Sequence, residues 1–181
     1  TGAVPYTDGE ADRQAALRAI QWSLDWFLDP IWFGHYPVEL HAWFAGLGVS
    51  PVALEGDFDD IRRPIDFIGC NYYCGRIHRH DPAAGIIASA ELDMGLPTSD
   101  IGWPFEPAGF HDSLRYVAHK YGRIPLYITE NGICVNDGPQ ASGGKAGSGG
   151  KAGRRADRRR LEYLRVHLAS LSRAFANGVD V

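Results

Sequence analysis

The chain has 181 residues, of which 45% are hydrophobic and 12% aromatic, and its formal net charge is −4. This composition is rich enough in apolar residues to form a core, which argues against global disorder. The slight acidity argues against nucleic acid or an anionic membrane as the main partner, because both attract a basic face. No segment approaches the roughly 18 apolar residues of a membrane-spanning helix.

The cysteine content and the N-terminus bear on location. Cys70, Cys74 and Cys134 are few and odd in number, so they do not suggest a disulfide framework. We expect buried thiols in a reducing compartment. No signal peptide is visible, although a missing N-terminal segment would hide one. The sequence therefore predicts a cytoplasmic protein.

The first part of the chain predicts two helices. Thr7 and Glu10 have the spacing of a capping box, and apolar residues at helical spacing follow them. We expect this first helix to end near Pro30, because proline cannot continue a helix. A short second helix starts with Pro37 in its first turn and stops at residue 46 or 48, both of which are glycine.

Two buried strands are predicted at residues 66–73 and 124–129, and both turn polar at their C-terminal ends. We expect residues 74–105 between them to be irregular. A helix then opens at Pro107 and stops at Gly122. The order of helices and strands predicts a parallel sheet covered by helices, as in a (β/α)8 barrel, whose chemistry lies at the C-terminal ends of the strands.

The last part of the chain begins with a repetitive tract. Residues 143–147 read GGKAG, and the same five letters recur at residues 149–153. We interpret residues 138–153 as a low-complexity loop insertion within a single domain that spans residues 1–181. A final helix follows, with apolar residues spaced by three and four: Leu161, Leu164, Leu168, Leu171 and Phe175. A third strand begins at Val179.

Glu130 is the sharpest candidate for chemistry, because a carboxylate directly after an apolar strand lies at the rim of the sheet. Its surroundings resemble glycoside hydrolase family 1. Residues 127–132 match the nucleophile signature of that family, and residues 66–73 resemble its strand six. Residues 26–37 resemble the segment after its strand five, residues 102–110 resemble the approach to its helix six, and residues 157–168 resemble its helix seven, all in the family's order. The resemblance implies an α/β fold, an incomplete (β/α)8 TIM barrel that comprises the C-terminal-side portion.

The same resemblance implies a retaining β-glycosidase of the β-glucosidase type, acting on a small β-glycoside or oligosaccharide. Glu130 is then the nucleophile, and Tyr73 donates a hydrogen bond that orients it and favours its anion. Asn71 binds the sugar or the catalytic carboxylates. Asn71 and Tyr73 share a face of their strand, whereas Tyr72 points away and is expected to pack. The family needs no cofactor or metal, and His78 and His80 lack an evident third ligand.

The acid/base glutamate of the family, which stands in an Asn-Glu-Pro run on strand four, has no counterpart in the sequence. We therefore expect the 181-residue chain by itself to be inactive and poorly soluble. One alternative is a non-catalytic, degenerate sugar-binding or interaction protein of the same fold. Another is a different barrel enzyme such as an aldolase, which would need a lysine at a strand end.

Overall fold

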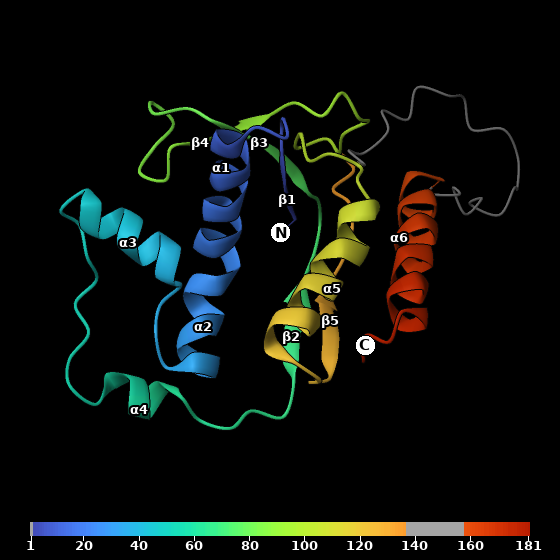
Figure 1. Cartoon of the computed structure of the whole chain (residues 1–181). Coiled ribbons are helices and arrows are strands. Elements are labelled where there is room, and N and C mark those ends of the chain that lie inside the picture. Colours follow the sequence, from blue (N-terminus) through green and yellow to red (C-terminus); the bar gives the residue numbers. More distant parts are fainter. Residues whose placement is uncertain (1, 137–157) are drawn as a thin grey trace, which may run out of the picture.

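The computed structural model describes residues 2–136 and 158–181, arranged as in Figure 1. The helical elements are α1 (Glu10–Ile20), the π-helix η1 (Gln21–Asp25), α2 (Trp26–Phe33), α3 (Val38–Gly46), α4 (Asp57–Ile61), α5 (Ala108–Tyr121) and α6 (Arg158–Ala176). The strands are β1 (Ala3–Pro5), β2 (Ile68–Asn71), β3 (Arg76–His80), β4 (Ser89–Leu92) and β5 (Leu126–Glu130). The predicted insertion at residues 138–153 lies outside the described residues.

The two predicted buried strands are confirmed as β2 and β5, which pair in parallel with Ile68 opposite Leu126. Both strands run from the bottom to the top of Figure 1, so their C-terminal ends meet at one edge. The amide of Leu126 also donates to the carbonyl of Asp180 at 2.8 Å. The chain after α6 therefore returns to the other side of β5, although residues 179–181 form no regular strand.

Helix α5 covers one face of the β2–β5 pair and supplies much of the core. Its buried Phe110, Leu114 and Val117 pack with Ile68 and Leu126 of the strands. Burying a side chain of this size contributes about 1.5–3 kcal/mol. The predicted start at Pro107 and stop at Gly122 are confirmed, and Gly122 has the positive φ of +83° that favours glycine.

The apolar residues of α6 at this spacing do not form its buried face, although Leu171 is partly buried against the core. Leu161, Leu168 and Phe175 are 61%, 59% and 65% exposed, and Leu164 is exposed as well. The helix instead buries a different face, made of Tyr163, His167, Ser170 and Ala174. The reason is that both faces carry apolar or aromatic groups, so spacing alone could not tell which face meets the neighbouring helix α5.

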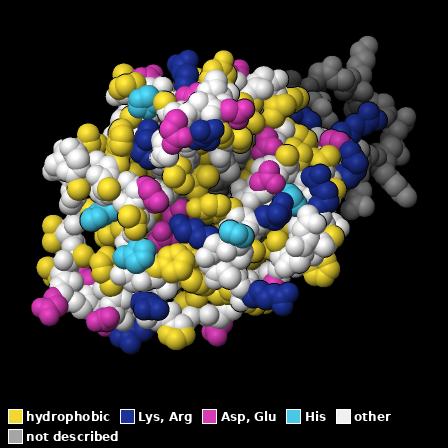
Figure 2. Space-filling model, in the orientation of Figure 1, with side chains coloured by type: hydrophobic (Ala, Val, Ile, Leu, Met, Phe, Trp, Pro, Cys, Tyr) yellow, Lys and Arg dark blue, Asp and Glu magenta, His cyan; other side chains and the backbone are white. Residues whose placement is uncertain are grey.

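The surface of the molecule mixes apolar, acidic and basic side chains across the face in Figure 2. Basic side chains gather at its right, over α6, where Arg158, Arg159 and Arg165 are exposed. Within residues 2–136 and 158–181, no helix has both the length and the apolar character that crossing a membrane requires. The cytoplasmic location stays a prediction.

The expectation that residues 74–105 are irregular is wrong in part, because they contain β3 and β4. These strands pair antiparallel, and β1 pairs with β3 in parallel, which gives a second sheet in the order β1-β3-β4. This sheet lies above the β2–β5 pair in Figure 1. The β3 sequence RIHRH is too polar to read as a buried strand. Arg18 of α1 fixes the chain just before β4 by donating to the carbonyls of Ile87 and Ala88.

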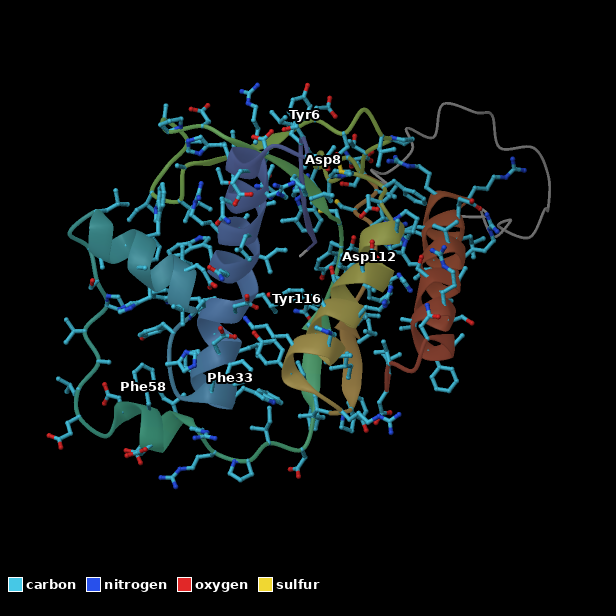
Figure 3. The ribbon with its side chains drawn as sticks, viewed as in Figure 1. Tyr6, Asp8, Phe33, Phe58, Asp112 and Tyr116 are labelled. Atoms are coloured by element: carbon cyan, nitrogen blue, oxygen red, sulfur yellow. The ribbon has the colours of Figure 1, made fainter. Side chains whose placement is uncertain are left out.

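The predicted capping box and the predicted end of the first helix are also wrong. Gly9 is the N-cap, and the Thr7 hydroxyl binds the Asp12 carboxylate at 2.6 Å. The helix continues through Pro30 to Phe33. Contacts with α5 outweigh the proline: Asp25 and Asp29 are buried, and both carboxylates lie within hydrogen-bonding distance of the Tyr121 hydroxyl, at 2.8 and 2.6 Å. Tyr116, labelled in Figure 3, also reaches Asp25 from α5.

Candidate active site

The edge where β2 and β5 end brings the predicted site residues together. Asn71 is the last residue of β2 and Glu130 the last of β5, and they are opposite each other. The register shifts just before this pair, since Cys70 is opposite Ile128 and Thr129 has no partner. Strict alternation would turn Glu130 toward the helices, as for Leu126 and Ile128. The bulge instead lets its carboxylate reach the end of β2.

The Tyr73 hydroxyl donates a short hydrogen bond to Oε2 of Glu130. This contact was predicted from the sequence, and the structure places the two groups together. The hydrogen bond to the carboxylate raises the pKa of Tyr73, with smaller contributions from burial and the carboxylate charge. The phenol is therefore a stable donor at neutral pH. An ionised carboxylate at an exposed strand end, oriented by one donor, can act as a nucleophile or a general base.

Asn71 lies on the same strand end but does not share this hydrogen bond. Its Oδ1 accepts from the Thr129 hydroxyl at 2.6 Å, and its side chain is exposed. Tyr72 points the other way, is buried, and stacks on Phe110 with ring centroids 4.9 Å apart. Its hydroxyl donates to the Glu106 carboxylate at 2.9 Å. The predicted opposite orientations of Tyr72 and Tyr73 are confirmed.

An open pocket of about 550 Å³ surrounds Glu130. Its described lining comprises Tyr73, Ile101, Trp103 and residues 129–134. The Trp103 ring lies 5.0 Å from the Tyr73 ring, measured between centroids. The structure places Trp103 beside the candidate nucleophile, where an aromatic face can stack on a sugar.

Sequence reasoning missed two further residues at this edge, Asn131 and Tyr163. Asn131 Nδ2 donates to the carbonyl of Tyr72 at 2.8 Å and to the Tyr163 hydroxyl at 3.2 Å. The Tyr163 hydroxyl donates to the carbonyl of Tyr73 at 2.9 Å. A signal was present, since Asn131 directly follows Glu130 and Tyr163 belongs to the segment that resembles helix seven of the family.

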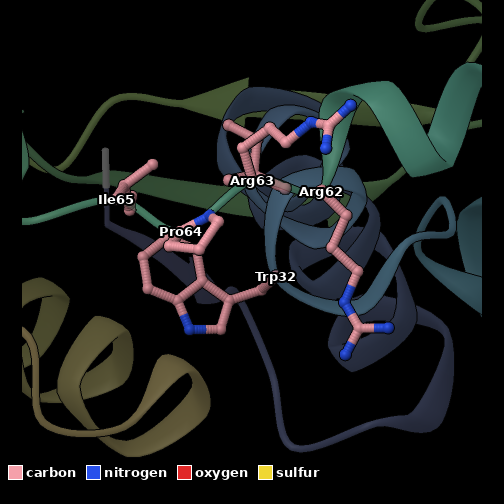
Figure 4. Close-up of a pocket in the computed structure, with 6 residues that line it drawn as sticks. Trp32, Arg62, Arg63, Pro64 and Ile65 are labelled. Carbon is pink, nitrogen blue, oxygen red and sulfur yellow. The ribbon is translucent and has the colours of Figure 1, made fainter.

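A second pocket, of about 330 Å³, lies before the start of β2, at the opposite end of the strands from Glu130 (Figure 4). Trp32 forms one wall, and Arg62, Arg63, Pro64 and Ile65 form the other. Its described lining offers cations but no carboxylate, so it lacks a nucleophile or acid for glycoside chemistry.

Other chemistries find less support in the described part of the chain. There, no group of three or more His, Cys, Asp or Glu side chains could hold a metal ion. The ends of β2 and β5 carry no lysine, which an aldolase would need. The cysteines are unpaired, and burial raises the pKa of the Cys70 and Cys74 thiols. Cys134 is exposed, so the expectation that all three are buried is wrong for that residue.

Comparison with known proteins gives the same family along the chain. The model of glycosyl hydrolase family 1 matches residues 1–181. The 1,4-beta-D-glucan glucohydrolase of Thermotoga neapolitana is 32% identical over 97% of this chain and 40% of its own length. The family 1 β-glucosidase from Thermotoga maritima has a TM-score of 0.83 at 29% identity, over 98% of this chain and 37% of that one. A second structure from that organism is complexed with a cyclophellitol analogue transition state mimic. It has a TM-score of 0.80 at 31% identity, over 98% of this chain and 37% of that one.

The chain thus spans about two fifths of the length of the relatives it matches. Its described strands form an arc of the family's α/β fold and close no barrel within residues 2–136 and 158–181. The relatives carry the names of glycosyl hydrolases, such as 1,4-beta-D-glucan glucohydrolase and beta-glucosidase A. On the strength of the family model and these relatives, the chain belongs to glycosyl hydrolase family 1.

Proposed function

We propose that Glu130 is the nucleophile of a retaining β-glycosidase of the β-glucosidase type, on the C-terminal-side portion of a (β/α)8 barrel. The single observation that carries the proposal is the Tyr73 hydroxyl bound to the Glu130 carboxylate where two parallel strands end. The complex of a relative with a cyclophellitol analogue supports a small glycoside as the substrate class.

The reaction follows from one ionised carboxylate beside an open pocket. A Glu130 oxygen attacks the anomeric carbon as the bond to the leaving oxygen breaks, and a second carboxyl group protonates that oxygen. Water, deprotonated by the same second group, then attacks the glycosyl-enzyme and releases a sugar of retained configuration. We expect Asn71, exposed at the end of β2, to bind a sugar hydroxyl.

The second carboxyl group must stand about 5–5.5 Å from the nucleophile in a retaining enzyme. The described lining of the pocket contains no carboxylate other than Glu130. We therefore expect the 181-residue chain by itself to lose the acid/base contribution, roughly 10²- to 10⁴-fold in rate. The group has to come from the barrel segment that this chain does not cover.

Covalent trapping tests the role of Glu130. A chimaera, in which residues 1–181 replace the matching segment of a complete family 1 β-glucosidase, is incubated with an activated 2-fluoro-β-glucoside. We expect a stoichiometric mass increase that peptide mapping places on Glu130. The Glu130→Gln variant should stay unlabelled, and a Glu106→Gln variant should be labelled like the parent, because Glu106 binds Tyr72 on the helix side. A label on any other carboxylate contradicts the assignment.

A non-catalytic sugar-binding protein is the second candidate, and the lone carboxylate in the described pocket lining favours it. Calorimetric binding of a β-glucoside by a chimaera that never labels would support this alternative. Labelling at Glu130 would exclude it.

A further inference from the structure

The groups in contact at the proposed reaction centre are themselves poorly enclosed. Glu130 is exposed and Tyr73 is only half-buried, with its ring against the loop residue Trp103. The orientation of the two side chains therefore depends on how firmly the backbones of the two strand ends are fixed. Beyond Asn71 the β2–β5 ladder contributes one more backbone bond, from the Tyr72 amide to the Glu130 carbonyl at 2.9 Å.

Two side chains continue this ladder where the backbone leaves it. Asn131 Nδ2 donates to the Tyr72 carbonyl at 2.8 Å, which ties the chain after Glu130 to the end of β2. The Tyr163 hydroxyl, from α6, accepts from the same Nδ2 at 3.2 Å and donates to the Tyr73 carbonyl at 2.9 Å. One buried phenol thus links the backbone of Tyr73, the side chain of Asn131 (the residue after Glu130) and helix α6.

The Tyr163 phenol is held rigidly enough to serve as this link. Its side chain is 1% exposed, and its ring stacks on His167 with centroids 3.7 Å apart and planes 17° from parallel. Phe105 packs edge-on against the same ring at 5.3 Å. Burial raises the pKa of Tyr163 to about 12, so the hydroxyl keeps its proton and remains a donor at neutral pH.

We propose that Tyr163, together with Asn131, is a positioning residue that holds the Tyr73 phenol against the Glu130 carboxylate. Neither residue contacts the reacting atoms, because Asn131 and Tyr163 donate to the backbone carbonyls of Tyr72 and Tyr73, just after β2. The inference rests on the proposed function only in taking Glu130 as the nucleophile. The link itself is a property of the fold and can be measured without turnover.

The test reads the ionisation of Tyr73 in the 181-residue chain. Tyrosine labelled with ¹³C at Cζ is titrated by NMR, and Tyr73→Phe assigns the resonance. In the parent chain Tyr73 titrates above its ordinary value of about 10, because it binds a carboxylate. In Tyr163→Phe, which keeps the stacked ring and removes only the hydroxyl, we expect the Tyr73 midpoint to move down toward that value.

Tyr116→Phe is the matched control, because it also removes one partly buried phenol hydroxyl, bound to Asp25 at 2.6 Å on the far side of α5. It should leave the Tyr73 midpoint in place. Asn131→Ala should lower the midpoint as Tyr163→Phe does, and the double variant should do no more than the larger single change, because both break one link. An unchanged midpoint in both single variants overturns the inference, as does an equal shift in the control.

A kinetic arm uses the chimaera, so the test does not depend on the solubility of the shorter chain. Tyr163→Phe should lower the rate constant of labelling by a 2-fluoro-β-glucoside about 10- to 100-fold, as loss of a supporting partner does at other sites. The dissociation constant of the reagent should stay at the parental value, because Tyr163 is buried and is not among the residues that line the pocket. Labelling of Glu130 at the parental rate overturns the positioning role and leaves the proposed function standing. A label elsewhere, with the Tyr73 midpoint still shifted, overturns the function alone.

Discussion

At the scale of single residues, the contact between Tyr73 and Glu130 sets which group holds a proton. The Tyr73 hydroxyl donates to a carboxylate, and losing its proton would place two negative oxygens side by side. This is why the hydrogen bond raises the pKa of Tyr73, and why the effect needs the charge and not only the shape of the glutamate.

The variant Glu130→Gln tests this reasoning, because the amide keeps the size of the side chain and removes its charge. We expect the pKa of Tyr73 to fall toward about 10. The ¹³C titration used for Tyr163→Phe measures it. Glu91→Gln is the control, since that glutamate pairs with Arg76 at 3.2 Å on the other sheet and should leave Tyr73 unaffected. If the titration midpoint of Tyr73 is the same in Glu130→Gln as in the parent chain, the contact between Tyr73 and Glu130 does not persist in solution.

The residue scale also shows where sequence reasoning stops. The pairing of Glu130 with Tyr73 followed from the family motif, and the opposite orientation of Tyr72 followed from strand alternation. The bulge at Thr129, which aims Glu130 at Tyr73, could not be predicted, because a β-branched residue there looks like ordinary strand. Tyr163 lies 33 residues after Glu130, and nothing in local spacing indicates that its hydroxyl returns to the end of β2.

At the scale of elements, α6 shows why helix position was predictable and helix orientation was not. Its start and end follow from the apolar spacing and from Gly178, which has φ of +85°. Which face of α6 is buried depends on what the helix packs against. Here it packs against the aromatic side chains at and before the start of α5, Phe105 and Phe110. Tyr163 and His167 fill that contact with ring atoms, so the leucines on another face remain outside.

His167 gives α6 a pH dependence that can be measured. The ring is fully buried, and burial lowers its pKa, although the Tyr163 carbonyl and the Glu106 charge oppose the shift. As pH falls below about 6.5, the unfolded chain takes up a proton that the folded chain resists. Stability is therefore present above that pH and is lost below it, with a slope of at most about 1.4 kcal/mol per pH unit for this group. Burial lowers the pKa of His78 as well, which adds to the slope.

We expect His167→Phe to flatten this dependence. Phenylalanine keeps the aromatic packing, and Nε2 of His167 is buried without a hydrogen-bond partner among the described residues. The measurement is urea unfolding near pH 7 and near pH 5.5, compared with the parent chain. The exposed His119 provides the control variant His119→Gln, which should retain the parental pH dependence. Equal slopes in the parent and His167→Phe would refute the assignment.

At the scale of the whole molecule, the chain resembles an arc cut from its relatives. It aligns with 37% of the Thermotoga maritima β-glucosidase, and within the described residues its parallel sheet has only β2 and β5. Side chains on the face of this sheet away from α5 are open, and Phe67 and Tyr127 are 54% and 59% exposed. Exposed apolar patches and free strand edges promote association in water. Together with the exposed leucine face of α6 (Leu161, Leu164 and Leu168), this gives the expected poor solubility a physical source on two separate surfaces.

The leucine face of α6 allows one of these surfaces to be tested alone. Replacing Leu164 and Leu168 by glutamate removes apolar area and adds two charges, so sedimentation velocity should show less self-association of the 181-residue chain. Ala169→Glu with Ser172→Glu is the matched control, because both positions are exposed on the same helix and the charge added is identical. If both pairs reduce association equally, net charge is the cause and the leucine face is not. In the chimaera, where the rest of the barrel is present, the leucine pair should instead lower the melting temperature, because those side chains would then be covered.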